Sequence, residues 1–489
     1  MKTLEQLQFN NTFSRLPGDF FSRLQTTPLA QQFLISFNPA AAELIELHAS
    51  EAQRADFVEL ITGKIKLPGY DPLAACYSGH QFGHYVPRLG DGRAILLGEV
   101  DTDHGQHWDM QLKGAGPTAY SRSGDGRAVL RSTIREYLCS EAMHGLGIPT
   151  TRALCIIGSN EEVYRESNEP GAMLLRMAPS HVRFGNFEYW FYTQQFAHLK
   201  TLADYVIANF YPQLADDKNP YLALLQQVIQ RTAKLIAHWQ AVGFSHGVMN
   251  SDNMSVLGLT LDYGPYGFLD TYDPDFICNH SDHHGRYAFK KQPEIGLFNV
   301  SCFAQAILPL LDQNPDAGVE MAKSALAEYE AQFIKHYAEL MRTKLGLAAT
   351  LPQDQQLCND LLTIMQNNHT DYTLLFRTLS QTDASQARDL VMDRDAFDAW
   401  YQQYSKRLQL ESMDATRRSQ AMQTINPKYI LRNYMTEIAI RLAEDKQDYS
   451  EINKLLKLMQ SPFDEHKEHE KYAGHPPEWA QKISVSCSS

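Results

Sequence analysis

The chain has 489 residues, of which 44% are hydrophobic and 21% are charged. This is the composition of a globular protein with about two or three packed domains. The formal net charge of −13 argues against a nucleic acid or an anionic membrane surface as a partner. Neither a secretory signal in the polar opening MKTLEQLQFNNTFSRL nor an apolar stretch near the roughly 18 residues that span a bilayer is expected. Seven cysteines without paired spacing indicate a reducing compartment, and a cytoplasmic location is expected.

The amino-acid composition changes within the first 195 residues. Residues 1–75 mix short apolar clusters with Pro and Gly turns and are predicted to form an irregular N-terminal wrap. Residues 76–195 are rich in glycine and short apolar runs, and 128–147 has helical spacing before a Gly stop. The predicted strands are AILLGEV (94–100), WDMQLKG (108–114) and AMLLRMA (172–178). Strands, one helix and further strands in this order predict an α+β fold.

Helices are predicted to dominate after residue 195. Apolar positions from Leu225 to Trp239 mark one face of a helix that ends at Gly243. MSVLGLTLDYG (254–264) is a strand-like insertion, and NPKYILRNYMTEIAIRLAE (426–444) is the clearest later amphipathic segment. The predicted units are the wrap 1–75, a strand-rich nucleotide-binding lobe 76–195, a helix-rich catalytic lobe 196–316, and a helical C-terminal extension and tail 317–489.

A short glycine-rich sequence occurs twice, as LGDGRA (89–94) and SGDGRA (123–128). Backbone N–H groups of such a corner converge on an anion, and an adjacent Arg adds a forked contact to phosphate oxygens. The corners Gly90–Arg93 and Gly124–Arg127 flank a candidate lysine, which favours a shared polyphosphate site. Ordinary Gly–Asp turns are the alternative.

Four charged residues near these corners are further candidates. Lys113 ends a predicted strand and Glu136 lies in the following predicted helix, the arrangement in which protein kinases aim a lysine at phosphate. A solvated surface pair is the alternative. Arg176 follows an apolar run and Arg183 lies in an aromatic loop, where each could contact phosphate or serve as a buried structural arginine.

HGVMNSDN (246–253) has the outline of a protein-kinase catalytic loop. Val248 stands five residues before Asn253, where a kinase has its catalytic base. Asn253 and Asp262 are hard oxygen donors of the kind that bind Mg²⁺. Asp252 is a candidate for accepting a proton or binding the metal, and a turn-forming aspartate is the alternative.

Histidines gather in the segment after Asp262. His280, Asp282, His283 and His284 could bind a metal, but their spacing is too tight for a helical His pair and the sequence offers no partner cluster. A polar loop that faces the substrate is the favoured interpretation.

Together these motifs resemble the selenoprotein O family of kinase-like proteins. The resemblance covers most of the chain and is carried by YSGHQFGHYVPRLGDGRAILLGE, QLKGAGPTAYSRSGDGRAVLRSTIREYL, HGVMNSDNMSVLGLTLDYGPYGFLD and the terminal SCSS. It implies a two-lobed, protein-kinase-like fold in which ATP lies flipped relative to ordinary kinases. It also implies transfer of AMP to Ser, Thr or Tyr hydroxyls of proteins, and of UMP from UTP with Mn²⁺. With the nucleotide reversed, the position that Val248 fills is no longer where the base is needed.

The resemblance assigns roles by motif. Asp252 matches the proposed proton acceptor, Glu136 supports the lysine, and Asn253 and Asp262 match the ligands of Mg²⁺ or Mn²⁺. The residues implied to bind the nucleotide are Gly90, Gly92, Arg93, Lys113, Asp125, Gly126, Arg176, Arg183 and Asp262. Cys487 stands where some family members carry selenocysteine, so selenium is not implied.

The expected function is a metal-dependent protein nucleotidyltransferase. A conventional phosphotransferase is the nearest alternative, and Val248 counts against it. A non-catalytic, ATP-binding pseudokinase scaffold is the other alternative, and the retained pair Asn253 and Asp262 counts against it. Cys487, in a polar tail, is predicted to pair with Cys278 as a redox switch, with a free thiol as the alternative.

Overall fold

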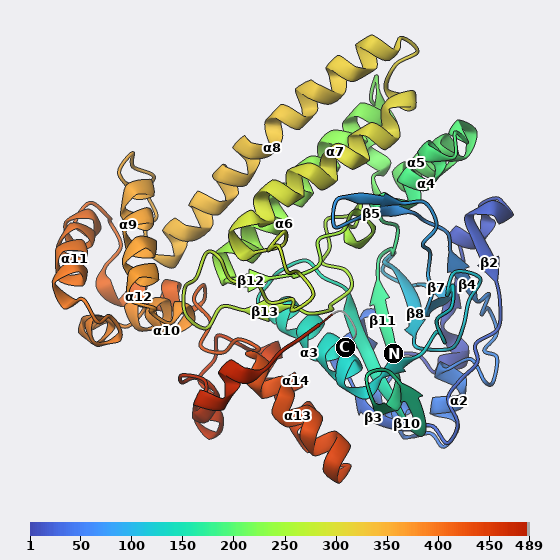
Figure 1. Ribbon diagram of the computed structural model, residues 1–489, viewed down its shortest axis with the longest axis horizontal. Coiled ribbons are helices and arrows are strands. Elements are labelled where there is room, and N and C mark those ends of the chain that lie inside the picture. Colours follow the sequence, from blue (N-terminus) through green and yellow to red (C-terminus); the bar gives the residue numbers. More distant parts are fainter. Residues whose placement is uncertain (487–489) are drawn as a thin grey trace.

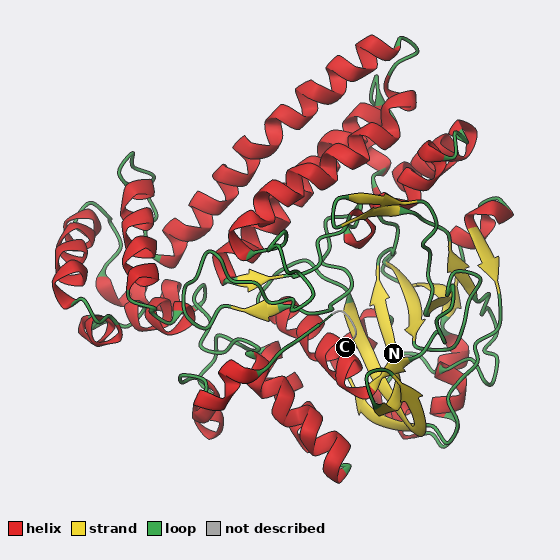
Figure 2. Ribbon diagram, viewed as in Figure 1, coloured by secondary structure: helices red, strands yellow, loops and turns green. Residues whose placement is uncertain are grey.

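An antiparallel, nine-stranded sheet of short and long strands lies at one end of the molecule (Figure 2). The structure, a computed structural model, describes residues 1–486. All pairings within this sheet are antiparallel, in the order β2-β4-β7-β8-β11-β10-β3, with β1 on β7 and β9 on β11. Its strands are β1 (Gln8–Phe9), β2 (Phe21–Arg23), β3 (Phe33–Phe37), β4 (Leu73–Ala75), β7 (Ala94–Asp101), β8 (His107–Lys113), β9 (Ala128–Val129), β10 (Arg152–Tyr164) and β11 (Asn168–Ala178). Two small hairpin pairs are separate from it: β5 (Gly79–Gln81) with β6 (His84–Val86), and β12 (Phe244–Ser245) with β13 (Gly267–Phe268).

The three predicted strands are confirmed as β7, β8 and β11. The first 75 residues, which we expected to be irregular, supply β1 to β4 of the same sheet. These strands have only two to five residues. β3 joins the sheet by pairing with β10, which lies more than a hundred residues later in the sequence. Such short runs carry too little alternation to be recognised without their partners.

Helices make up most of the remaining chain, which confirms the α+β class (Figure 1). They are α1 (Pro39–Leu44), α2 (Phe57–Ile61), α3 (Leu130–Gly145), α4 (Phe184–Tyr192), α5 (Phe196–Phe210), α6 (Pro220–Val242), α7 (Gln292–Leu311), α8 (Pro315–Lys344), α9 (Asp354–Asn367), α10 (Tyr372–Leu379), α11 (Arg394–Leu408), α12 (Ala415–Gln423), α13 (Asn433–Lys446) and α14 (Ser450–Gln460). In Figure 1, α6, α7 and α8 run side by side as long rods, and their contacts with one another agree with that view.

Both faces of the large sheet are covered. One apolar cluster joins α1 and α2 to side chains of β7, β8, β10 and β11. On the opposite face α3 packs against β10 and β11, and α13 and α14 pack on α3. The helix that we predicted at residues 128–147 is therefore buried between the sheet and the C-terminal helices, which fixes its position relative to β8.

Local signals explain the ends of the predicted helix α6. The Asn219 side chain accepts a hydrogen bond from the Leu222 N–H at 3.1 Å, and Pro220 follows at the first helical position. Gly243 ends the helix with a φ of 75°, in the left-handed region that glycine adopts without a steric penalty. The predicted stop at Gly243 is confirmed.

Two segments have a secondary structure that differs from the predicted one. Residues 254–260 are not a strand, because isolated bridges such as Met254 with Thr260 take the place of a ladder. The amphipathic segment 426–444 becomes helical only at Asn433. Its first seven residues are non-helical, and Arg432 among them is buried in an ion pair with Asp371 at 2.9 Å.

We expected no apolar stretch long enough to span a bilayer, and one helix does not meet this expectation. Phe289–Leu311 spans 23 residues with a mean hydropathy of 1.5, which is enough by length and composition to cross a bilayer. It is the single such helix in the described part of the chain, and 56% of its most apolar window is buried inside the molecule. Most of this segment is α7, which packs against α4, α6 and α8 as a core helix does.

Candidate active site

A large cavity collects most of the predicted site residues. Its volume is ≈ 1010 Å³, and a nucleoside triphosphate needs a cleft of about this order. The predicted residues that line it are Gly90, Gly92, Arg93, Lys113, Asp125, Gly126, Glu136, Arg176, Asp252, Asn253 and Asp262. Val248 lines it as well.

Strand register brings two of the cations together. Lys113 of β8 is paired with Leu174 of β11, and Gln111 is paired with Arg176. Because side chains alternate along a strand, these four residues point to the same face of the sheet. That face is covered by α3, which carries Glu136. The Glu136 carboxylate binds both cations, with Oε2 on Lys113 Nζ and Oε1 at 3.0 Å from Arg176 Nη1.

Asp262 is the acidic centre of this basic group. Arg176 Nη1 donates to its Oδ1, Lys113 Nζ lies 3.5 Å from the same oxygen, and its Oδ2 accepts from Arg183. Burial alone would raise the pKa of Asp262, but the charges of Arg176, Arg183 and Lys113 outweigh burial and hold that pKa well below its usual range. The carboxylate is therefore ionised and already neutralised by cations.

Arg183 lies behind the cavity wall. Its side chain is 2% exposed, and its guanidinium lies 4.7 Å from the centre of the Tyr77 ring. Arg183 is the residue just before α4, where its backbone N–H donates to Asn186 Oδ1 at 2.9 Å. It reaches the site through Asp262 and through the backbone oxygen of Asp252, 2.9 Å from Nη1. Among the described lining residues the cations are Arg93, Lys113, Arg122, Arg127, Arg165 and Arg176.

The loop HGVMNSDN also lines the cavity, through Val248, Asn250, Asp252 and Asn253. The Asn253 amide donates from Nδ2 to the Val248 backbone oxygen at 3.0 Å, so its Oδ1 is left to accept a hydrogen bond or to bind a metal ion. Asp252 is 7% exposed and accepts from Gln81 Nε2 at 3.1 Å. Burial raises the pKa of Asp252 to about 7, against the opposing effects of the Gln81 hydrogen bond and the Arg183 charge.

The segment that leads into the second glycine corner lies against the first corner. The Ser121 hydroxyl donates to the Gly92 oxygen, and the Thr118 hydroxyl donates to the Asp91 oxygen at 2.6 Å. Gly90 has a φ of 100°, and a Cβ there would lie 2.4 Å from the Tyr120 ring. This corner therefore requires glycine for its backbone conformation and for the packing of Tyr120.

The second corner is held by a residue that we had not singled out. Arg165, in the turn between β10 and β11, forms a two-pronged ion pair with Asp125, Nη1 to Oδ2 at 2.8 Å and Nη2 to Oδ1 at 3.1 Å. The hydrogen bonds from Arg165 lower the pKa of Asp125. Arg93 of the first corner has an exposed side chain with no ion pair among the described residues, so it is available to an anion.

A hairpin missed by the sequence analysis also lines the cavity. Tyr77, Gln81 and Phe82 come from the segment YSGHQFGH, from which we had assigned no candidate. The dipeptide Phe82–Gly83 between two short extended runs was the available signal of a tight hairpin turn. Nothing in that pattern indicates that the hairpin lies on the HGVMNSDN loop.

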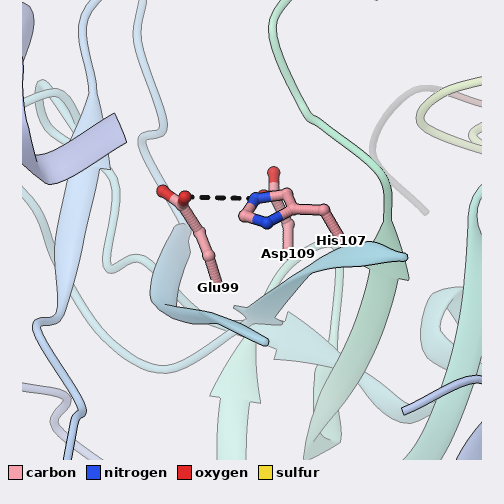
Figure 3. Close-up of side chains that lie close together, drawn as sticks. All are labelled: Glu99, His107 and Asp109. Carbon is pink, nitrogen blue, oxygen red and sulfur yellow. Dashed lines mark ion pairs between the residues drawn. The ribbon is translucent and has the colours of Figure 1, made fainter. Parts of the chain in front are cut away.

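The only group of three or more His, Cys, Asp or Glu side chains whose ligand atoms cluster in the described chain lies outside the cavity. It is Glu99, His107 and Asp109 on β7 and β8 (Figure 3). His107 Nε2 is 3.2 Å from Glu99 Oε2. Both Glu99 oxygens already accept from the Thr12 and Phe13 backbone N–H groups, which ties the N-terminal segment to β7. The residues His280 to His284 form no such group.

The structure describes only one cysteine of the predicted redox pair. Cys278 is buried, and its thiol donates to the Ser245 oxygen and hydroxyl at 3.5 and 3.4 Å. Cys487 lies outside the described residues. The tail nevertheless approaches the loop, because the His280 N–H donates to the Val485 oxygen at 2.8 Å.

A cavity lined by cations that suit phosphate, by one amide oxygen and by two carboxylates has the groups to bind a polyphosphate together with a divalent metal. These are the groups that a nucleotide-dependent transferase uses. The family model described as protein adenylyltransferase SelO matches residues 3–460, and the chain belongs to this family.

Individual relatives are similar to this chain over their full length. The chain is 56% identical over 493 residues to the protein nucleotidyltransferase YdiU of Thioalkalivibrio sulfidiphilus, and 53% identical over 496 residues to that of Myxococcus xanthus. Each comparison covers 100% of both chains. The protein of the same name from Pseudomonas fluorescens is 48% identical over 494 residues. The family resemblance implied by the motifs is confirmed, and the family is one of nucleotidyltransferases.

Proposed function

We propose that this chain is a metal-dependent protein nucleotidyltransferase that transfers AMP from ATP to Ser, Thr or Tyr hydroxyls of protein substrates, and UMP from UTP in the same site. The observation that carries the proposal is one cavity lined by Lys113 and Arg176, by Asp262 in contact with both, and by Asp252 and Asn253 of the HGVMNSDN loop. Family membership supports the type of transfer.

In the proposed reaction the oxygen of a substrate hydroxyl attacks the α-phosphorus of ATP. The bond from that phosphorus to the bridging oxygen of the β-phosphate breaks, and pyrophosphate leaves. The hydroxyl proton passes to the carboxylate of Asp252, which supplies the general base that Val248 cannot. ATP is bound in the flipped orientation, with its γ-phosphate towards Lys113 and Arg176. Its α-phosphate then faces the loop that carries Asp252.

Asn253 and Asp262 are the proposed ligands of Mg²⁺ or Mn²⁺. The donors present fit such an ion, since Asn253 keeps its Oδ1 free of the Val248 contact and Asp262 is an ionised carboxylate. A bound divalent ion supplies charge stabilisation to the phosphate oxygens. The phosphates of ATP would in turn compete with Asp262 for Lys113 and Arg176, which frees that carboxylate.

The proposal includes the organisation and location of the chain. Residues 76–195 and 196–316 would act as the nucleotide-binding and catalytic lobes of a kinase-like fold. Residues 1–75 would wrap the first lobe, and 317–489 would form the C-terminal extension. The support is that the cavity takes its lining both from the large sheet with α3 and from the loop after α6. The expected setting is the cytoplasm.

The test is to incubate the protein with Mg²⁺ or Mn²⁺, a protein substrate, and ATP labelled on the α- or the γ-phosphate, with α-labelled UTP in a parallel arm. Label from the α-phosphate is expected on protein, and γ-label is not. Transfer of γ-label would identify a conventional phosphotransferase. Nucleotide binding without either label on protein would identify a pseudokinase scaffold.

A further inference from the structure

The β5–β6 hairpin ends in a tight two-residue turn directly over the catalytic loop. Phe82 and Gly83 both have positive φ, 49° and 85°, which is the backbone of a type I′ hairpin turn. Gln81 and His84 are the residues that pair across this turn. Phe82 is not a glycine, so contacts around the hairpin must hold its backbone in the left-handed region.

Those contacts come from Tyr287 and from the two residues that precede Asp252. The His80 N–H donates to the Ser251 hydroxyl oxygen at 2.7 Å. The Phe82 N–H donates to the Tyr287 hydroxyl oxygen at 2.9 Å and to Asn250 Oδ1 at 3.2 Å. The backbone is therefore bound to the loop on both sides of Gln81. Since neighbouring side chains of a strand alternate in direction, this attachment fixes where the Gln81 side chain points.

Gln81 uses that position to hold the Asp252 carboxylate. Its Nε2 lies 3.1 Å from Oδ2, and no other side chain of the described residues donates a hydrogen bond to this carboxylate. The second oxygen, Oδ1, is buried without a hydrogen-bond partner. Without Gln81, no side chain would determine the rotation of the carboxylate about its terminal bond.

The hairpin approaches Asp252 as closely as its backbone allows. A Cβ on Gly79 would lie 2.8 Å from the Asp252 Cβ, so any side chain at that position would push the hairpin away. A second attachment lies at the base of the hairpin, where His80 Nδ1 is 2.6 Å from Oε2 of the fully buried Glu188. The element that carries Gln81 is thus anchored at its base and at its tip.

We propose that Gln81 is a positioning residue for Asp252 in the transfer reaction. It does not take the proton itself; it holds the carboxylate of Asp252 in the orientation in which that group receives the proton of the substrate hydroxyl. This inference rests on the proposed function, in which Asp252 is the base.

The experiment measures transfer of α-labelled ATP to protein by the full chain carrying Gln81→Ala or Gln81→Glu. Gln81→Glu keeps the size of the side chain but cannot donate to a carboxylate when ionised. His84→Ala, on the same hairpin and outside the cavity lining, is the matched control. For both Gln81 variants kcat is expected to fall about 10- to 100-fold, the range for a lost hydrogen bond to a charged group. KM for ATP and the affinity for ATP by calorimetry are expected to change less than about twofold.

A double variant separates positioning from any other role. In the Asp252→Ala background, Gln81→Ala is expected to cause no further loss, because the residue then has nothing to position. Multiplicative losses in the double variant, full activity of Gln81→Glu, or a loss that appears only in ATP affinity would each overturn the inference. If the unaltered chain and His84→Ala transfer no α-label at all, the proposed function itself fails. If they do and the Gln81 variants match them, only the positioning role fails.

Discussion

Arg183 and Asp262 form a buried ion pair, with Nη1 of the arginine 2.8 Å from Oδ2 of the aspartate. The same nitrogen lies 2.9 Å from the backbone oxygen of Asp252. One guanidinium thus joins the proposed metal ligand to the loop that carries the proposed base. These two contacts of one guanidinium hold Asp262 in a fixed position relative to the loop that carries Asp252.

Asp262→Ala is expected to lower transfer of α-label by at least about 100-fold, because a metal-bound carboxylate contributes several kcal/mol to stabilising phosphate charge. Asn253→Ala is expected to have a smaller effect, since it removes a neutral ligand. Transfer is measured over a range of Mg²⁺ and Mn²⁺ concentrations. Asp216→Ala, at an exposed position, is the control. Full activity of Asp262→Ala with either ion would remove Asp262 from the site.

Lys113→Met is expected to weaken ATP binding about tenfold or more, because a charge-assisted contact to phosphate is lost while the length of the side chain is kept. Arg183→Ala is expected to weaken it as well, indirectly, by releasing Asp262. Calorimetric titration with ATP gives the affinities, and thermal unfolding shows whether each variant is folded. Lys335→Met, on the exposed side of α8, should bind ATP as the unaltered chain does. Unchanged affinity in a folded Lys113→Met variant would contradict a shared polyphosphate pocket.

Lys344 makes stability depend on pH. Burial lowers the pKa of this lysine from 10.5 to about 7, and its ammonium lies 4.4 Å from the centre of the Phe376 ring. Between these two values the unfolded chain binds a proton that the folded chain does not. The free energy of unfolding therefore gains up to about 1.4 kcal/mol per pH unit as pH rises from 7 towards 10.

Lys344→Met, which keeps the side-chain volume, is expected to raise the free energy of unfolding at pH 7 and to remove this gain. Urea unfolding at pH 7 and pH 9.5 measures both effects. Lys335→Met on the same helix keeps the buried lysine and should keep the pH dependence. An equal dependence in Lys344→Met and the unaltered chain would mean that Lys344 stays protonated in the fold.

Oxidation is expected to produce a Cys278–Cys487 peptide in a non-reducing map, and dithiothreitol to remove it. The prediction rests on the backbone hydrogen bond between His280 and Val485, since His280 is two residues from Cys278 and Val485 is two residues from Cys487. Burial raises the pKa of the Cys278 thiol to about 12, so little thiolate is present and the bond should form slowly. Cys487→Ser should abolish any redox response of transfer activity. Loss of activity on oxidation that persists in Cys487→Ser would assign the response to another thiol.

The amino-acid sequence predicted those parts of the site that depend on neighbours along the chain. The glycine corners, the strand that ends at Lys113 and the helix that carries Glu136 each have a local cause in turn chemistry or side-chain periodicity. The stop of α6 at Gly243 is of the same kind. Strands and helices with these signals form where the pattern indicates.

Local sequence thus accounts for the chemical groups of the site and for the strands, helices and turns that carry them. The tertiary structure alone decided which groups meet: the contact of Gln81 with Asp252 spans 171 positions, and that of Arg183 with Asp262 spans 79. It also decided that Arg183 lies behind the cavity wall and that residues 1–75 complete the sheet. Contacts at such separations are selected by burial, charge compensation and strand pairing over the whole chain, and no local pattern records them.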